Sequence, residues 1–462
     1  KIFLASFLYK NNLSFIFNYL PKMIHTIEVR YVLSENDFYM LIQDIYDLNK
    51  FDKKKLDRFL HYKNGKFILP NLPTGINRIE FYYNAEIKST LYIKIQIDLQ
   101  ALSYGLPTVD LFQPSLGTTF RVCVAYAEAI LKIFPSLTAL KLDTSVYTNK
   151  DSNIEATACS LEALPYLTLG TTTQIDYSMN MRVAEEDKKA VLTCIKGSYY
   201  SSTKKISKFD KHVDGTKNLN LYAENKLSST KVYDKQRYYK DKKIQISDEL
   251  REASDNIIRF EYSVRNNLRN FILKGYNLPY KFKNSPFLLS PVAFFDYDDC
   301  NKNIMTIYSK EIDTKDWYNK DRYKKIINKS SLSEHKKSAI LEDIAPTLSI
   351  ARSTVSALEK YVNGYVHPQS HKKIKGSAAT FKSYLNDIRS LNLQPFRVPG
   401  KANKTHIINP VSIIQHNRWN VKPDYDIPKH IFRNIEKLLF NMWLNELHRT
   451  PLPKWELTKK VS

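Results

Sequence analysis

Strand-like and helix-like segments alternate along most of this chain, and that alternation limits the folds open to it. Helical spacing covers Glu35–Phe59, with Ser34 as a candidate N-cap, and Arg121–Phe134. Strand-like alternation of apolar and polar residues recurs in four segments, Ile24–Leu33, Arg78–Tyr83, Leu91–Leu99 and Thr171–Val183. Short turn-like connections favour antiparallel pairing. We therefore predict an α+β fold, an antiparallel-sheet palm with helices on one face.

The character of the chain changes after Pro279. Helical patterns return over three segments, Ser333–Ile344, Leu348–Asn363 and Ala378–Leu393. In the last segment Ser377 is the expected N-cap, and Phe381, Leu385 and Ile388 share one face. This segment follows the basic turn His371–Gly376. The pattern is compatible with a helix-turn-helix or winged-helix DNA reader and equally with an ordinary helical bundle.

These patterns predict four parts of the chain. Residues 23–282 form the α+β domain, 283–330 a loop-rich connector, and 331–462 a helical, DNA-binding C-terminal domain. The first Met is Met23, directly before a strand pattern, so we interpret 1–22 as an upstream extension; a degenerate signal peptide is the alternative. Each apolar run in that extension is too short to span a bilayer, and no membrane association is expected.

Composition indicates a polyanionic partner. The chain has 70 Lys and Arg against 47 Asp and Glu, a net charge of +23 over 462 residues. Its 31 Tyr and 23 Phe favour nucleic acid over lipid, because aromatic rings stack on unpaired bases. An AT-rich genome also enriches Lys and Tyr. Four scattered cysteines without a CxxC pair fit a reducing cytoplasm, and the absence of GxxxxGK[ST] argues against an ATP-driven motor.

The basic, tyrosine-rich segment KVYDKQRYYKDKK occupies Lys231–Lys243 and precedes the strand-like RFEYSVR of Arg259–Arg265. A tyrosine hydroxyl among cations is suited to attack on a phosphodiester when a metal ion lies nearby. Asp176 and Glu261 are lone acids in strand-like segments, and Asp98 is a third. We predict that these three carboxylates hold one Mg²⁺ or Mn²⁺, with a structural salt bridge as the alternative for each.

The ordered segments IHTIEVR, QIDYSMNMR, KVYDKQRYYK, IIRFEYSVRNNLRNF and TFKSYLNDIRSLNL resemble the gene II/X replication initiators of filamentous phages. The similarity runs from about Met23 to Leu393. It implies a rolling-circle endonuclease that nicks one strand of origin DNA and becomes linked to the 5′ phosphate through tyrosine. Such an enzyme leaves a 3′ hydroxyl primer and later rejoins the displaced strand.

By this resemblance Tyr233 is the nucleophile, and Lys235 matches a lysine common in the family. Tyr239 with Lys242 is an alternative Tyr-x-x-Lys pair, and Tyr238 is a third candidate. The chain departs from the family in three ways. Tyr238 replaces the usual carboxylate, QALSYGLPTVD stands where the family has Gly-His-Asn, and no histidine-hydrophobe-histidine pair occurs.

The predicted partners are double- and single-stranded origin DNA and the helicase and polymerase of a bacterial host, with assembly of several copies on the DNA as an option. Eight cations are predicted to contact DNA: Lys231, Lys240, Arg259, Arg265, Lys372, Lys373, Lys382 and Arg389. Two other functions remain open. One is a non-catalytic initiator or repressor that binds the origin, and the other is a mobilisation relaxase.

Overall fold

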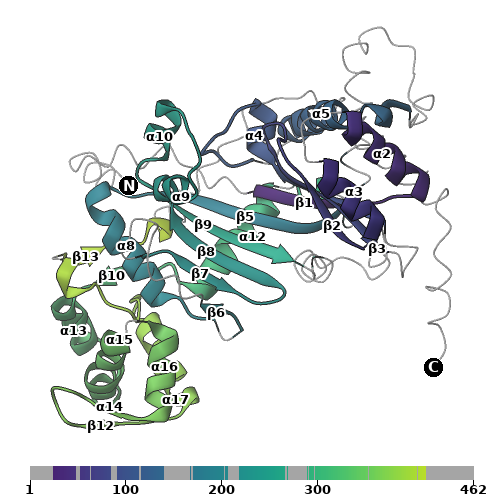
Figure 1. Cartoon of the computed structure of the whole chain (residues 1–462). Helices are drawn as coiled ribbons and strands as arrows, with labels where there is room; N and C mark the ends of the chain where they lie inside the picture. Colours follow the sequence, from purple (N-terminus) through teal and green to yellow (C-terminus); the bar gives the residue numbers. More distant parts are fainter. Residues whose placement is uncertain are drawn as a thin grey trace.

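The computed structural model has one large antiparallel sheet at its centre (Figure 1). It describes residues 24–47, 53–62, 64–84, 91–113, 116–139, 167, 170–201, 203–206, 218–265, 268, 289, 291–295, 297–351, 353–402 and 404–412. The nine strands are ordered β2-β3-β4-β1-β5-β9-β8-β7-β6. Their bounds are β1 Ile24–Val32, β2 Asn64–Leu69, β3 Ile76–Asn84, β4 Tyr92–Asp98, β5 Thr171–Arg182, β6 Lys205–Ile206, β7 Leu221–Glu224, β8 Ser228–Asp234 and β9 Ile257–Arg265.

Five helices cover the apolar face of this sheet and complete its core: α2 Glu35–Asp47, α3 Lys53–Tyr62, α5 Leu116–Ile133, α8 Glu185–Ser198 and α12 Tyr297–Glu311. Aromatic contacts join the layers. The ring of Phe81 on β3 contacts Phe38 of α2 and Phe134 after α5, and Phe260 on β9 contacts Tyr308 of α12. The predicted α+β class is therefore confirmed.

Most predicted elements are present, with shifted bounds. Ser34 accepts a hydrogen bond from the Asp37 amide, as an N-cap should, but the predicted helix Glu35–Phe59 is two helices, α2 and α3. Strand β2 was not predicted. Helix α5 begins at Leu116, inside a stretch with Pro114 and Gly117 that reads as a loop.

A second apolar core lies in the helical region, which we define as Lys320–Leu393. Its elements are α13 Lys320–Lys329, α14 Glu334–Ser338, the π-helix η7 Ala339–Ile344, α15 Ala345–Ala351, α16 Thr354–Asn363, the hairpin of β11 Tyr365–Val366 and β12 Lys373–Ile374, and α17 Ala378–Ser390. Ser377 caps α17, and its predicted apolar face is buried. The predicted helix Leu348–Asn363 is divided between α15 and α16.

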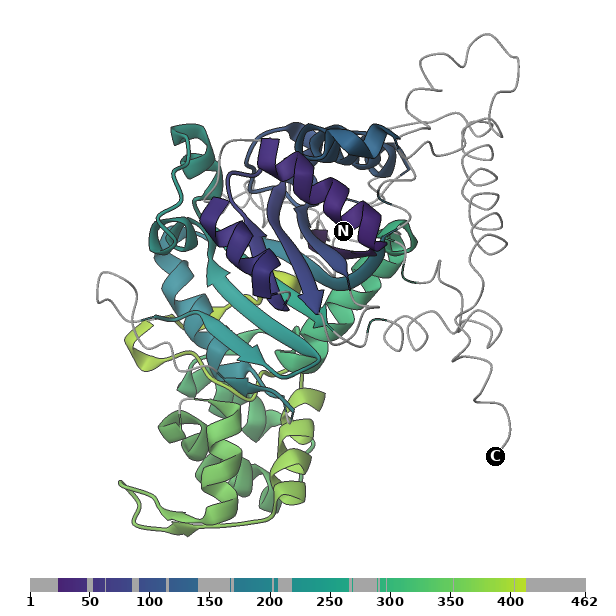
Figure 2. The same ribbon diagram turned by 45° about the vertical axis from the view of Figure 1, so that its right-hand side comes forward.

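Figures 1 and 2 place the helical region at one end of the molecule, beside α8. The Thr354 hydroxyl at the start of α16 donates to the Gly197 carbonyl at the end of α8, at 3.0 Å. The predicted connector 283–330 is largely helical where the structure describes it. It contains α12, which belongs to the first core through Ile304 and Tyr308, and α13, which belongs to the second.

Candidate functional site

The central strands of the sheet carry buried polar residues on the face opposite these five helices. On β5 and β9, Ser178 lies opposite Glu261, and on β8 and β9, Lys231 lies opposite Glu261. Side chains alternate between the two faces of a strand, so Asp176 points to the same side as Ser178 and Glu261. The two strands that carry Asp176 and Glu261 therefore pair, with both carboxylates on one face.

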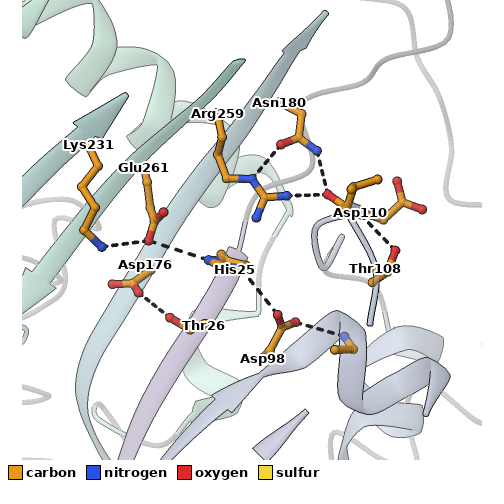
Figure 3. Close-up of polar contacts among 12 residues, drawn as sticks. His25, Thr26, Asp98, Thr108, Asp110, Asp176, Asn180, Lys231, Arg259 and Glu261 are labelled. Atoms are coloured by element: carbon orange, nitrogen blue, oxygen red, sulfur yellow. Dashed lines mark hydrogen bonds and ion pairs between the residues drawn. The ribbon is translucent and has the colours of Figure 1, made fainter. Parts of the chain in front are cut away.

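A bulge in β1 adds a histidine to this face. Ile24 pairs with Tyr177 and Ile27 with Ile175, so two residues, His25 and Thr26, lie opposite Asp176. Imidazole Nδ1 of His25 lies 3.7 Å from Glu261, and Nε2 lies 3.5 Å from Asp98 (Figure 3). His25 thus links two of the three predicted metal ligands. It was not predicted, because a single histidine beside a threonine gives no signal until the bulge and the distant strands are known.

Glu261 is the centre of the cluster. The Lys231 ammonium lies 3.1 Å from its carboxylate, and the Tyr233 hydroxyl donates a hydrogen bond to it at 2.8 Å. Burial alone would raise the pKa of Glu261. Lys231, His25 and the Tyr233 hydroxyl together outweigh burial and hold this pKa well below its ordinary value. Glu261 is therefore a buried carboxylate that stays ionised at neutral pH.

The other two acids also have protein partners. Asp176 accepts hydrogen bonds from the Thr26 hydroxyl and, at 2.8 Å, from the Gln174 amide. Asp98 caps α4 (Leu99–Tyr104) by accepting from the Ala101 amide at 3.0 Å. Burial raises the pKa of Asp98, but His25 and this backbone bond lower it below the ordinary value.

These partners bear on the predicted metal. In the described part of the chain, no group of three or more His, Cys, Asp and Glu side chains is close enough to hold a metal ion. The carboxylates of Asp176, Glu261 and Asp98 instead bind a lysine, a histidine, neutral donors and a backbone amide. As arranged, they do not fit Mg²⁺ or Mn²⁺, which need several converging oxygens. The metal ion stays a prediction.

The three candidate tyrosines lie together, at the end of β8 and on α9 (Lys235–Asp241). The Tyr233 side chain is 2% exposed, and burial followed by the charge of Glu261 raises its pKa well above the ordinary value. The half-buried Tyr238 ring lies 5.0 Å from that of Tyr233. Tyr239 is buried, which raises its pKa to about 12, whereas Lys242 at the end of α9 is exposed.

Two further predicted residues, Arg259 and Lys235, are buried beside these tyrosines. Arg259 donates through Nε to the Asn180 side chain at 2.8 Å and through Nη2 to the Val109 carbonyl. The Lys235 ammonium lies over the Tyr239 ring at 4.7 Å. Burial first, and then the charge of Arg259, lower the pKa of Lys235 well below its ordinary value.

The remaining predicted DNA contacts differ in availability. Lys240, Lys373 and Lys382 are exposed. Arg265 contacts Ser229 and Glu224, Lys372 contacts Asp343 and Glu342, and Arg389 contacts Asp313. Arg389 lies 3.1 Å from the buried Asp313, in the segment before the helical region.

None of the helices in the described ranges is long and apolar enough to cross a bilayer. No protein-family model matches the chain, and no curated protein matches it significantly. The functional assignment therefore rests on the residues and their geometry.

Proposed function

We propose that this protein cleaves and rejoins one strand of DNA through a tyrosine, as an initiator of rolling-circle replication does. The observation that carries the proposal is the hydrogen bond from the Tyr233 hydroxyl to Glu261, at 2.8 Å, within a cluster that also holds Lys231 and His25. A nucleophile beside an ionised acceptor and several cations is the arrangement that phosphodiester transfer requires. The net charge of +23 supports a polyanionic substrate.

In the proposed reaction the Tyr233 oxygen attacks a backbone phosphorus, and its proton passes to Glu261. The bond from phosphorus to the 3′ oxygen breaks, the phosphate stays on tyrosine, and the 3′ oxygen is protonated from water. The raised pKa of Tyr233 keeps the phenol neutral until attack, so proton transfer to Glu261 accompanies bond formation. Rejoining is the reverse reaction, with a 3′ hydroxyl as the nucleophile.

We also propose that the helical region binds duplex DNA. From Lys320 to Leu393 the chain has fourteen Lys and Arg against six Asp and Glu. The succession α15, α16, the β11–β12 hairpin and α17 is compatible with a helix-turn-helix followed by a hairpin wing. Exposed Lys373 lies in that hairpin and exposed Lys382 on α17, where both can reach a phosphate backbone.

The decisive experiment is formation of a covalent adduct. Labelled single-stranded oligonucleotides and a supercoiled plasmid carrying the cognate origin are incubated with the protein and Mg²⁺, and adducts are resolved after denaturation. Tyr233→Phe should lower adduct formation by about 10³-fold or more. The matched controls Tyr238→Phe and Tyr239→Phe, from the same cluster, should retain it.

An adduct that persists in Tyr233→Phe but disappears in one control would move the nucleophile to that residue. A second candidate function, non-catalytic origin binding, is favoured by the 2% exposure of Tyr233 and by acids that already have partners. It predicts sequence-specific binding without any adduct in the wild-type protein, unchanged by a metal chelator.

A further inference from the structure

Two buried cations beside the polar face, Arg259 on β9 and Lys235 on α9, have hydrogen-bond donors that the protein leaves unused. Arg259 is 0% exposed, and its Nη1 atom has no hydrogen-bond partner. Figure 3 shows the guanidinium held at its two other nitrogens, by Asn180 and the carbonyl before Asp110. Both of those partners are neutral. The positive charge of Arg259 therefore has no carboxylate in direct contact among the described residues.

Lys235 is in the same situation. Its side chain is 3% exposed, and no described carboxylate lies within ion-pair distance of its ammonium. Its contacts are the rings of Tyr239, at 4.7 Å, and Tyr238, at 5.4 Å. Aromatic faces attract a cation but accept no ordinary hydrogen bond from it. No described group therefore accepts an ordinary hydrogen bond from the Lys235 ammonium.

The two cations share one neighbourhood, because Arg259 on β9 lies opposite Tyr233 on β8, and Lys235 follows Tyr233 by two residues at the start of α9. Arg259 repels Lys235 strongly enough to lower its pKa, and the charge of Arg259 also acts on Tyr233 and Tyr239. Asp98 and Glu261 attract Lys235 from a distance, but they are bound to the Ala101 amide, His25 and Lys231. A buried charge without a paired counter-ion is costly and rare unless a ligand supplies the counter-charge.

We propose that Arg259 and Lys235 form an anion site for a DNA backbone phosphate, positioned so that its phosphorus faces the tyrosine cluster. This inference rests on the proposed function, of which it specifies the substrate contact. A phosphodiester carries one negative charge and two free oxygens. One oxygen accepts from Nη1 of Arg259 and the other from the Lys235 ammonium, which neutralises the charge that develops during transfer.

The shape of the site follows from how Arg259 is held. Because Nε and Nη2 already donate hydrogen bonds, the guanidinium cannot rotate to bind a phosphate in a bidentate way. It presents one nitrogen, Nη1, at a fixed position. Asn180 and the Val109 carbonyl are therefore positioning groups. A fixed arginine and a lysine bind the two free oxygens of a tetrahedral phosphodiester but give no discrimination between bases.

The test uses two probes, inorganic phosphate and an unlabelled thymidine tetranucleotide, with binding to the full-length protein measured by calorimetry. Lys235→Met preserves length and removes the charge, and Arg259→Lys keeps the charge but loses the fixed guanidinium. Each should weaken binding of both probes by about tenfold or more, since hydrogen bonds to charged groups are lost. The control is Lys205→Met, an exposed lysine on β6, which should change affinity less than about twofold.

The inference is overturned if wild-type protein binds neither probe, or if Lys205→Met weakens binding as much as Lys235→Met, which would indicate bulk charge alone. Circular dichroism checks that each variant is folded; should Arg259→Lys fail to fold, Lys235→Met decides. The covalent assay separates this site from the function. Phosphate binding that survives Tyr233→Phe, in a protein that never forms an adduct, would retain the anion site and reject the tyrosine chemistry.

Discussion

The polar face of the sheet and the helical region are both rich in charge, but they arrange it in opposite ways. On the sheet, the buried Glu261 and the half-buried Asp98 lie against Lys231, His25 and a backbone amide. In the helical region cations outnumber acids, and α13 exposes four lysines that form no ion pair with a described carboxylate: Lys320, Lys324, Lys325 and Lys329.

This difference in the burial and pairing of charges suits the two regions to different roles. Buried charges with fixed partners keep their geometry and are little affected by salt, which suits a reaction centre. Exposed, unpaired cations attract a polyanion over a long range and release counterions when it binds, which suits docking on a DNA backbone. Five predictions test how far the contrast holds.

The largest expected effect is on folding. Glu261→Gln leaves Lys231 without its carboxylate, and we expect the free energy of unfolding in urea to fall by about 3 kcal/mol. The matched variant is Glu334→Gln, whose carboxylate is exposed and pairs with Lys337 one turn along α14. That exposed pair should be worth about 0–1 kcal/mol. Equal losses in the two variants would contradict the contrast.

The same residue predicts an acid dependence. The folded-state pKa of Glu261 lies well below its unfolded value, so its contribution is present above the ordinary carboxyl pKa and is lost as pH falls through the folded value. Wild-type stability should therefore decline in acid more steeply than that of Glu261→Gln. Parallel curves of unfolding free energy against pH would show that Glu261 is not held ionised by its partners.

Lys235 affects the pH dependence of folding stability through a lowered pKa of a cation, where Glu261 acts through a lowered pKa of an acid. Burial and Arg259 lower its folded pKa below the unfolded value, so the unfolded chain binds more protons and stability rises with pH between the two values. Lys235→Met should stabilise the protein without ligand by roughly 1–2 kcal/mol near neutral pH. The gain should disappear at strongly alkaline pH. A destabilised variant would mean that its contacts with the tyrosine rings outweigh burial.

A smaller effect is expected on DNA affinity. Replacing Lys320, Lys324 and Lys325 of α13 by Gln removes three exposed charges from the helical region. The slope of log affinity against log salt for duplex DNA should fall by about 2–3, since each phosphate contact contributes about 0.9. The matched triple replaces the exposed Lys53, Lys54 and Lys55 of α3, far from the helical region. Equal salt-dependence slopes for the two triple variants would indicate that α13 is an ordinary solvated helix.

The smallest effect concerns one helix end. The Ser377 hydroxyl accepts from the Thr380 amide at 3.0 Å and begins α17. Ser377→Ala should cost about 1 kcal/mol in thermal or urea unfolding. Ser383→Ala, at an exposed position inside the same helix, should lie within about 0.5 kcal/mol of wild type.

Many strands and helix starts of this fold depend on residues that are close together in the chain, and they can therefore be predicted from the sequence. Apolar and polar residues alternate along β1, β3, β4 and β5, because one face of each strand packs on the helices, and a helix start needs a side-chain acceptor, as Ser34 and Ser377 provide. Asp176 and Glu261 were recognisable for the same reason, since an acid in a strand-like segment must meet a partner. The α+β class follows from these patterns.

Tertiary structure alone decided what those acids meet. The bulge that turns His25 toward Glu261 and Asp98 depends on the register between β1 and β5, and the unused nitrogen of Arg259 depends on Asn180 and the Val109 carbonyl. These pairings join strands and loops that are distant along the chain. The strand register is set by the packing of the whole sheet. No local pattern of residues therefore determines which charged side chains are paired within the protein and which are left unpaired.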